Sequence, residues 1–344
     1  MKFVKLAHGS GGEETGELLN EILFSKVPER LKKVPEGLGI DLPDDGAVIP
    51  VKNSKIVVST DSYTVNPPFF PGGNIGMLSA IGSINDVVVM GAKPIAGLDS
   101  IIVEEGFPIE DLKTIVDSLI EVFKKEGVAL VGGDFKVMPK GGIDRIVITT
   151  TVLGIAERTI VDLPKEGDKL IVTDYVGDHG AVIMMLQMGL SDVEELKCGM
   201  LRSDAKPLTA LLPVINAYSE HINACRDITR GGLGGVLNDW AKNVEAVLVV
   251  DSDLPIKEPV KRYSEMLGID PIYLASEGSA LFSVSSEVAE EFLEALKKQG
   301  FENARLIGEV RKSEKYKGYV LMKTAVGGFR IVEPPRGELV PRIC

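Results

Sequence analysis

The chain is poor in the residues that cross-link small secreted proteins or bind structural metals. Only three cysteines occur among its 344 residues, Cys198, Cys225 and Cys344, and none belongs to a CxxC pair. This spacing argues against a zinc site and a disulfide framework, and it is typical of a reducing compartment where thiols stay free. Glutamine is also scarce, with Gln187 and Gln299 alone, which weakly suggests a thermophilic source.

Long apolar runs and an excess of positive charge are absent too. No run approaches the roughly 20 apolar residues that a membrane-spanning helix needs. The basic N-terminus soon turns glycine-rich and acidic, so it lacks the apolar core of a signal peptide. A net charge of −12 argues against a nucleic-acid backbone or an anionic membrane as partner. We therefore expect a cytoplasmic protein with about two domains and neither nucleic-acid nor membrane partners.

Glycine is plentiful and clusters in loops that can bind anions. Two such loops are Gly132-Gly133, which leads into Asp134 and Lys136, and the glycine-rich stretch from Arg230 to Gly235. Glycine lets backbone amides converge on an anion, although each loop alone could equally be a flexible connector. No GKS or GKT follows, which excludes a Walker loop. The first glycine loop of the chain precedes a helix predicted from about Thr15, and it consists of His8, Gly9, Ser10, Gly11 and Gly12.

Aspartates stand at the ends of several predicted strands and inside one apolar helix. Single aspartates at strand ends are usually turn formers, whereas several on adjacent strands are better explained by a cation that offsets their repulsion. Together with glycine loops and no Walker lysine, they predict a nucleotide bound through Mg²⁺, with three or four carboxylates on the metal. The predicted metal ligands are Asp45, Asp61, Asp86, Asp134 and Asp227. Asp44, also a metal candidate, and Asn85 join the first glycine loop as predicted nucleotide- and phosphate-binding residues.

The chain ends in a segment that reads as neither helix nor strand. Twelve residues run from Glu333 to Cys344 and include Pro334, Pro335 and Gly337. Fully extended, they span at most roughly 40 Å, enough to carry the Cys344 thiol from a site inside the protein to one outside. The alternative is a frayed terminus that happens to end in cysteine.

The order of the motifs HGSGG, DDGAV, STD, IND, GGD, RDITRGG and PRIC resembles the HypE family of hydrogenase maturation factors. That family belongs to the superfamily of aminoimidazole ribonucleotide synthetase and selenophosphate synthetase. The resemblance covers nearly the whole chain. The middle motifs specify the superfamily, and the terminal Arg342-Ile343-Cys344 points to HypE.

The resemblance implies a two-domain, aminoimidazole-ribonucleotide-synthetase-like α/β fold of the α+β type. It also implies that the first-domain sheets pair in a homodimer and that the C-terminal tail is flexible. The expected boundaries are 1–40 for the glycine-rich segment and first helix, 41–157 for the ATP-binding and dimerisation domain, 158–332 for the second domain, and 333–344 for the tail.

The resemblance further implies an ATP- and Mg²⁺-dependent carbamoyl dehydratase. Its terminal cysteine, here Cys344, would receive a carbamoyl group from HypF. ATP would activate the carboxamide oxygen, loss of water would give a thiocyanate, and the cyanide would pass through HypC and HypD to the iron of a [NiFe] hydrogenase. The nitrogen must lose two protons, so a base must stand near it, and Lys136 and Glu277 are the candidates. A solvated lysine and a loop glutamate are their alternative roles.

Two other functions stay open at this point. One is a superfamily enzyme that acts on a free small-molecule substrate, which leaves Cys344 without a role. The other is an ATP-gated scaffold whose tail cysteine binds a partner's metal, although one thiol is a poor metal site. Removal of Cys344 alone separates them, because a free-substrate enzyme would keep its turnover and a carrier would lose it.

Overall fold

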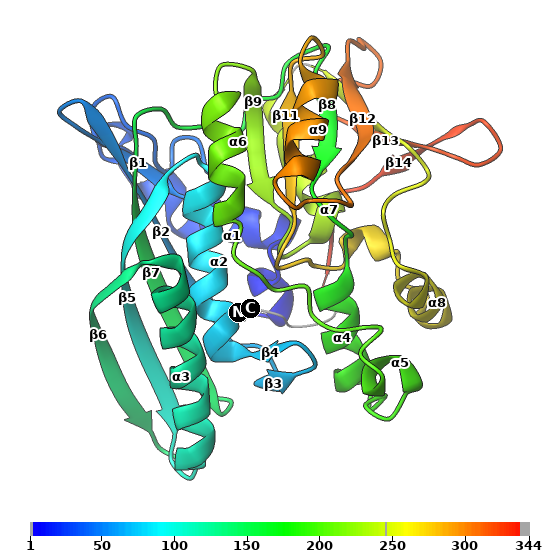
Figure 1. Ribbon diagram of the computed structural model, residues 1–344. Coiled ribbons are helices and arrows are strands. Elements are labelled where there is room, and N and C mark those ends of the chain that lie inside the picture. Colours follow the sequence, from blue (N-terminus) through cyan, green and yellow to red (C-terminus); the bar gives the residue numbers. More distant parts are fainter. Residues whose placement is uncertain (1–2, 245, 338–344) are drawn as a thin grey trace.

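Two β-sheets, one in each half of the chain, form the framework of the two domains (Figure 1). The computed structural model describes residues 3–244 and 246–337. Strands β5 and β6 run parallel, as do β10 and β13, and the other paired strands of both sheets run antiparallel. This mixture of helices with largely antiparallel sheets confirms the predicted α+β class. No helix in the described ranges is both long and apolar enough to cross a membrane.

The first domain carries a five-stranded sheet in the order β1-β2-β7-β5-β6. Its strands are β1 (Ala47–Val51), β2 (Ser54–Tyr63), β5 (Lys93–Glu104), β6 (Ala129–Met138) and β7 (Ile146–Ala156). Helices α2 (Ile75–Val89) and α3 (Ile109–Glu126) cover one face (Figure 1). A small ribbon of β3 (Phe69–Phe70) and β4 (Gly73–Asn74) precedes α2.

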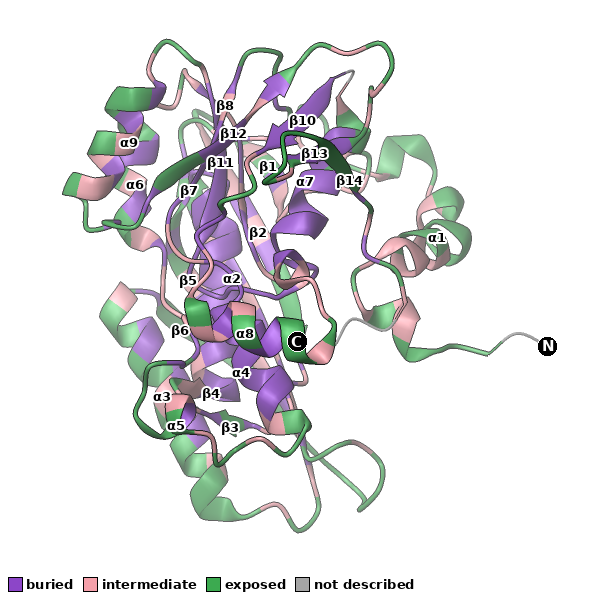
Figure 2. Ribbon diagram, turned by 90° about the vertical axis from the view of Figure 1, so that its right-hand side faces the viewer, coloured by how far each residue is buried: buried purple, intermediate pink, exposed green. Residues whose placement is uncertain are grey.

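Helix α2 is the central element of the fold, and almost all of its residues are buried (Figure 2). Asn74 caps it, because its side chain accepts hydrogen bonds from the amides of Gly76 and Met77. The helix packs on β2 and β7, on α3 and on strand β9 of the second domain. A helix that is apolar on every side must be enclosed in this way. Any polar residue on it therefore lies inside the protein.

The second domain carries a seven-stranded sheet in the order β14-β13-β10-β12-β8-β11-β9. Alternate residues of strand β11 (Ala280–Val284) point to opposite faces of this sheet. Phe282 packs edge-on against Phe292 on one face, whereas Leu281 joins the hydrophobic cluster around Trp240 on the other. The strands are β8 (Lys169–Val172), β9 (Ile222–Asp227), β10 (Val247–Val250), β11 (Ala280–Val284), β12 (Arg305–Arg311), β13 (Val320–Lys323) and β14 (Phe329–Val332).

Helices flank this second sheet and fill the surrounding connections. They are α4 (Asp178–Gln187), α5 (Glu194–Lys197), α6 (Leu212–Ala217), α7 (Gly232–Asn243), α8 (Glu258–Leu267) and α9 (Ala289–Lys298). Helix α1 (Glu13–Ile22) stands near the N-terminus. Short 3₁₀ turns complete the list: η1 (Leu6–Gly9), η2 (Phe24–Lys26), η3 (Glu29–Leu31), η4 (Thr209–Leu211) and η5 (Pro271–Tyr273).

Candidate active site

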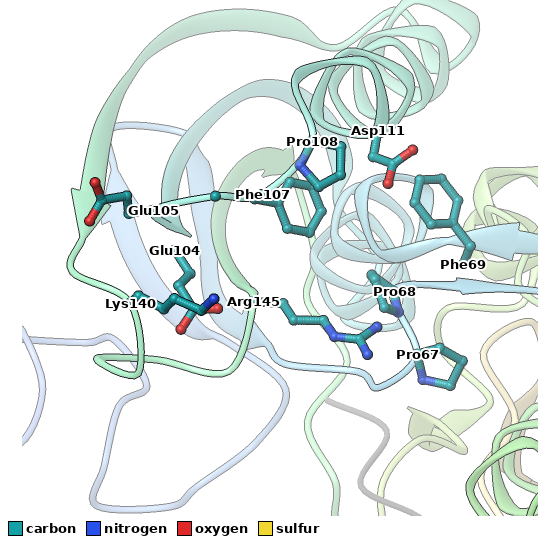
Figure 3. A pocket seen from close by; sticks show the side chains of 11 residues that line it. Pro67, Pro68, Phe69, Glu104, Glu105, Phe107, Pro108, Asp111, Lys140 and Arg145 are labelled. Atoms are coloured by element: carbon teal, nitrogen blue, oxygen red, sulfur yellow. The ribbon is translucent and has the colours of Figure 1, made fainter.

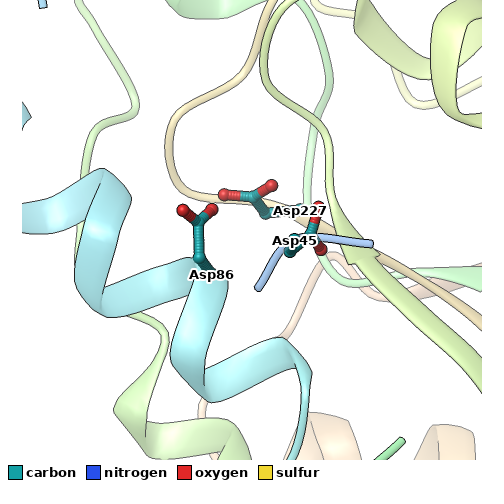
Figure 4. Close-up of side chains that lie close together, drawn as sticks. All are labelled: Asp45, Asp86 and Asp227. Carbon is teal, nitrogen blue, oxygen red and sulfur yellow. The ribbon is translucent and has the colours of Figure 1, made fainter. Parts of the chain in front are cut away.

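Three of the predicted metal-binding aspartates meet where the two domains join (Figure 4). One oxygen from each of Asp45, Asp86 and Asp227 lies within 4.8 Å of the others. Asp45 precedes β1, Asp86 lies late in α2, and Asp227 ends β9. The first two belong to one domain and the third to the other, so the site exists only when the domains pack together.

The electrostatics of this trio favour a bound cation. Burial raises the pKa of Asp86 well above its usual value, and the charges of Asp61 and Asp227 raise it further. Burial and the charge of Asp45 likewise raise the pKa of Asp227. One carboxylate oxygen on Asp45 and one on Asp227 are buried without a hydrogen-bond partner among the described residues. An all-oxygen set with unused, mutually repelling ligands fits Mg²⁺ or a similar hard divalent cation.

Asp86 is oriented by the neighbouring strand. The Ser59 hydroxyl on β2 donates a 2.5 Å hydrogen bond to Asp86 Oδ2. Asp61, two residues further along β2, lies near enough for its charge to raise the pKa of Asp86, Asp227 and Glu277. Asp61 therefore belongs to the same electrostatic site. Burial raises the pKa of Asp61, and the charge of Arg230 offsets part of this rise.

Arg226 on β9 is the cation that the sequence reasoning missed. Its Nε lies 2.8 Å from Asp162 Oδ2 and 3.2 Å from Asp45 Oδ1, and it is mostly buried. It supplies a fixed positive charge behind the metal-binding trio, and its own pKa is raised by these carboxylates. The available signal was a second charged residue beside Asp227 in a short strand, Ile222–Asp227, whose residues are buried or half-buried.

Asp44 and Asn85 form hydrogen bonds between the first domain and residues that follow it in the chain. Asp44 accepts hydrogen bonds from the amides of Asp45 and Asp162, at 2.8 and 3.1 Å, and so ties β1 to the interdomain segment. Asn85 accepts from the amide of Leu208 at 2.8 Å, and its side-chain nitrogen donates to the carbonyl of Lys206 at 3.2 Å. Both side chains are thus engaged in contacts with the second domain, and their predicted role in nucleotide binding stays a prediction.

Glu277 lies in the same interior region. It is only 2% exposed, and its Oε1 has no hydrogen-bond partner among the described residues. Burial, and then the charges of Asp204 and Asp61, raise its pKa well above the usual value, while Arg230 lowers it. A buried carboxyl with a free oxygen and a raised pKa has the properties of a general base or acid.

Asp134 and Lys136 lie apart from this cluster within one chain. They sit on β6, at the edge of the first sheet, and form an exposed 2.8 Å ion pair with each other. Strands β7 and β5 lie between β6 and β2 in the sheet. At the usual spacing between neighbouring strands, β6 and β2 are therefore roughly 14 Å apart. The structure therefore does not bring these two predicted residues to Asp45 and Asp86 of the same chain.

The first glycine loop uses its polar groups locally. The His8 Nδ1 atom accepts from the amide of Lys5 at 3.0 Å, and the Ser10 hydroxyl donates to the carbonyl of Leu6 at 3.1 Å. Arg230 connects this loop to the acidic site: it donates to the carbonyl of Gly9 at 3.5 Å, and its side chain fills the space beside Gly11.

The base of the predicted tail is held by three separate elements. The amide of Glu13 donates to the carbonyl of Pro335 at 3.2 Å. The carbonyl of Glu333 accepts from Tyr273 at 2.8 Å and from Asn238 at 3.3 Å. The predicted carrier, Cys344, lies outside the described residues. Of the other two thiols, that of Cys198 is exposed and that of Cys225 is buried.

A separate cavity of about 390 Å³ lies at the end of β5 and the start of α3 (Figure 3). Pro67, Pro68, Phe69 and Phe107 line it together with the side chain of Arg145. None of the predicted site residues lines this cavity, so it is distinct from the interdomain site.

Comparison with known proteins places this architecture in a defined class. Residues 43–156 match the N-terminal domain of the AIR synthase related proteins, and residues 165–321 match the C-terminal domain of the same family. The two matched segments contain the first sheet, strands β8 to β12 of the second sheet and the three clustered aspartates.

Individual relatives narrow the assignment. The carbamoyl dehydratase HypE of Azotobacter vinelandii is 37% identical over 347 residues, which cover 99% of this chain and 97% of that protein. A crystal structure of a HypE–HypF complex superposes with a TM-score of 0.82 at 35% identity, covering 94% of this chain and 100% of the other. A HypE structure in complex with ATP gives a TM-score of 0.78 at 33% identity, covering 99% and 100%. The chain therefore belongs to the HypE family of AIR synthase related proteins.

Proposed function

We propose that this protein is an ATP-dependent carbamoyl dehydratase that converts a carbamoyl group on the Cys344 thiol into a thiocyanate. The product would supply the cyanide ligand of a [NiFe] hydrogenase iron. The observation that carries the proposal is the interdomain site itself. There, three aspartates that can bind a metal lie near the buried Glu277, whose Oε1 has no hydrogen-bond partner among the described residues. Relatives along the full chain are named carbamoyl dehydratases, and a HypE structure contains ATP.

The aspartates would hold the nucleotide through Mg²⁺. Asp45, Asp86 and Asp227 offer the ligand oxygens, with Asp61 beside them. When bound, Mg²⁺ neutralises phosphate charge and makes the γ-phosphorus easier to attack. Arg226 stays behind the trio and limits its net negative charge when no cation is bound.

Glu277 would accept protons from the carboxamide nitrogen. An amide oxygen is a poor leaving group, and phosphorylation by ATP makes it a good one. The nitrogen must then lose its protons as the carbon–nitrogen triple bond forms, which requires a base in a site closed to water. Glu277 is enclosed and has an unused oxygen, whereas Lys136 is exposed and paired with Asp134.

Lys136 and Asp134 would act across a homodimer. Every residue of β6 is exposed, including the large apolar side chains of Val131 and Phe135. Exposed apolar strands at a sheet edge are normally covered by a partner. We therefore infer that first-domain sheets pair in a dimer and that β6 residues contribute to a nucleotide site at that interface.

The carrier segment would move about a fixed base. The carbonyls of Glu333 and Pro335 are hydrogen-bonded to the body of the protein, so the segment would turn about Gly337. Gly337 has a φ of 79°, which favours glycine. The seven residues beyond it span at most roughly 25 Å when extended. That length must carry the thiol between the interdomain site and the partners, HypF as carbamoyl donor and the HypC–HypD complex as cyanide acceptor. We place this reaction in the cytoplasm, where the thiol stays reduced.

Mass spectrometry of the full chain tests the proposal. Incubation with HypF and a carbamoyl source should add one carbamoyl group to the C-terminal peptide, and Mg-ATP should then remove the mass of one water. Cys198→Ala is the matched control, because it removes an exposed thiol and should leave both steps intact. Modification of Cys344→Ala to the wild-type extent would refute the carrier role.

A further inference from the structure

Two loops of the second domain interlock directly behind Glu277. The amide of Glu277 donates to Asp204 Oδ1 at 3.2 Å, and the amide of Lys206 donates back to the Glu277 carbonyl at 3.3 Å. Gly278 packs so closely that an added Cβ would lie 2.1 Å from the Asp204 carbonyl oxygen. Asp204 is therefore fixed beside Glu277 by the backbone on both sides, and no larger residue fits at position 278.

Asp204 has an unused oxygen in this contact. Its Oδ2 is buried without a hydrogen-bond partner among the described residues, while its Oδ1 accepts from the amides of Glu277 and His179. Two neighbouring carboxylates have lysine partners, since Asp174 pairs with Lys206 and Asp178 with Lys257. Asp204 has no such ion pair in the described chain, so it is the carboxyl in this group whose charge is least compensated.

The reaction releases a proton that must leave this enclosed region. In the first step the carboxamide oxygen bonds to the γ-phosphorus, the bond from that phosphorus to ADP breaks, and one N–H proton passes to a base. In the second step the carbon–oxygen bond breaks and phosphate departs with its electron pair. The second N–H proton passes to this phosphate, and the N–H electron pair becomes part of the triple bond. The balance is thiocarbamate plus ATP⁴⁻ giving thiocyanate, ADP³⁻, HPO₄²⁻ and H⁺. Phosphate thus takes up one of the two nitrogen protons, and the other must reach solvent.

We propose that Asp204 is the residue through which this net proton passes from Glu277 toward solvent, directly or through one water. The inference rests on the proposed function and assigns a relay residue that acts through Glu277. Beyond Asp204 lies the Lys206–Asp174 pair, whose lysine side chain is 42% exposed. The path therefore runs from a fully buried carboxyl, through a half-buried one, to the surface.

The charges that face Asp204 place it in a suitable range for this role. Burial, and then the charge of Asp178, raise its pKa to about 7, whereas the hydrogen bond from the Glu277 amide and the charge of Lys206 lower it. The amide of His179 also donates to Asp204 Oδ1 and so helps to orient the carboxyl. A carboxyl near neutrality can both accept and release a proton during turnover.

Single-turnover dehydration of the carbamoylated full chain, followed by mass spectrometry from about pH 6 to pH 9, tests this relay. The wild-type rate should fall below about pH 7, where Asp204 becomes protonated. In Asp204→Asn the rate should fall about 10²-fold. The acidic limb should move to lower pH, because the Asp204 charge that raises the pKa of Glu277 is lost. Asp204→Glu should restore both in large part. Carbamoylation by HypF should be unchanged in each variant.

Asp174→Asn is the matched control. It removes a neighbouring carboxylate that pairs with Lys206 and, among the described residues, makes no hydrogen bond to Glu277. It should keep the acidic limb. If Asp204→Asn does not fold, Lys206→Met tests the relay instead. Loss of the Lys206 charge raises the pKa of Asp204, so the acidic limb of the rate profile must move to higher pH. A limb that stays in place there, or an Asp204→Asn protein with wild-type rate and profile, overturns the relay. Absence of water loss in the wild type instead refutes the proposed function.

Discussion

The amide of Glu13, at the first turn of α1, donates its hydrogen bond to the carbonyl of Pro335 at the other end of the chain. A helix N-terminus after a glycine loop commonly binds an anion. Here that position serves the base of the predicted carrier segment. Two side chains reinforce it: Glu14 accepts from the Gly337 amide at 3.0 Å, and Arg336 pairs with Glu13 at 2.7 Å.

The first prediction concerns this contact. Gly12→Ala should open it, because an added Cβ would lie 2.5 Å from the Pro335 carbonyl oxygen, a backbone atom that cannot simply rotate away. The amides of Glu13 and Gly337 should then exchange hydrogen faster, which peptide-resolved hydrogen exchange measures. Gly16→Ala, with no atom within 4 Å of the new Cβ, should leave both amides protected and stabilise α1 by about 1 kcal/mol. Equal exchange in the two variants would contradict the contact.

The second prediction separates metal binding from stability. Burial and the Asp45 charge raise the pKa of Asp227, so its ionised form costs stability at neutral pH when no cation is bound. Asp227→Asn should therefore unfold at a higher denaturant concentration without Mg²⁺. Its affinity for Mg²⁺ should fall at least about tenfold. Calorimetric titration and denaturant unfolding measure the two effects. Asp253→Asn, on an 84% exposed side chain, should change neither. Unchanged Mg²⁺ affinity in Asp227→Asn would exclude it from the metal site.

The third prediction follows from a buried histidine. Burial lowers the pKa of His179 from 6.5 to about 3, and its Nδ1 is hydrogen-bonded to Ser203 at 2.8 Å. The unfolded chain binds a proton at this position below about pH 6.5, whereas the folded chain does not. The stability from neutral His179 is thus complete above that pH and is lost toward pH 3, by up to about 1.4 kcal/mol per pH unit.

Denaturant unfolding at several pH values checks this dependence. His179→Gln can keep a hydrogen bond to Ser203 but does not titrate. The difference in unfolding free energy between wild type and His179→Gln should shrink as the pH falls below 6.5. A pH-independent difference would mean that His179 titrates equally in both states.

Local patterns were sufficient for many of the helices and strands and for part of the site. The apolar stretch around Asp86 predicted a buried helix with an aspartate that needs a partner, and α2 places Asp86 within reach of Asp45 and Asp227. Strand β10 and helix α8 were not predicted. The four residues of β10 form a continuous apolar run, in which periodicity cannot separate a strand from a buried helix.

The remaining site residues depend on contacts that no local pattern contains. Arg226 and Asp204 acquire their roles from loops and strands distant in the sequence. Asn85 accepts a hydrogen bond from the Leu208 amide, a contact that domain packing supplies and that no local pattern contains. Its expected place at the nucleotide stays a prediction. The Glu13–Pro335 contact joins residues at opposite ends of the chain, and tertiary structure alone brings them together.

The last prediction concerns the exposed strand β6. Phe135 is 52% exposed on this edge strand, next to the Asp134–Lys136 pair. If β6 and its sheet face a second copy of the chain, Phe135→Lys should place a charge in an apolar interface and shift the protein from dimer to monomer in sedimentation experiments. Ile109→Lys is the control, because Ile109 is 68% exposed at the start of α3, on the face covered by helices. It should leave the association state unchanged. A wild-type protein that sediments as a monomer at micromolar concentration would refute the pairing and leave Lys136 without a path to the nucleotide site.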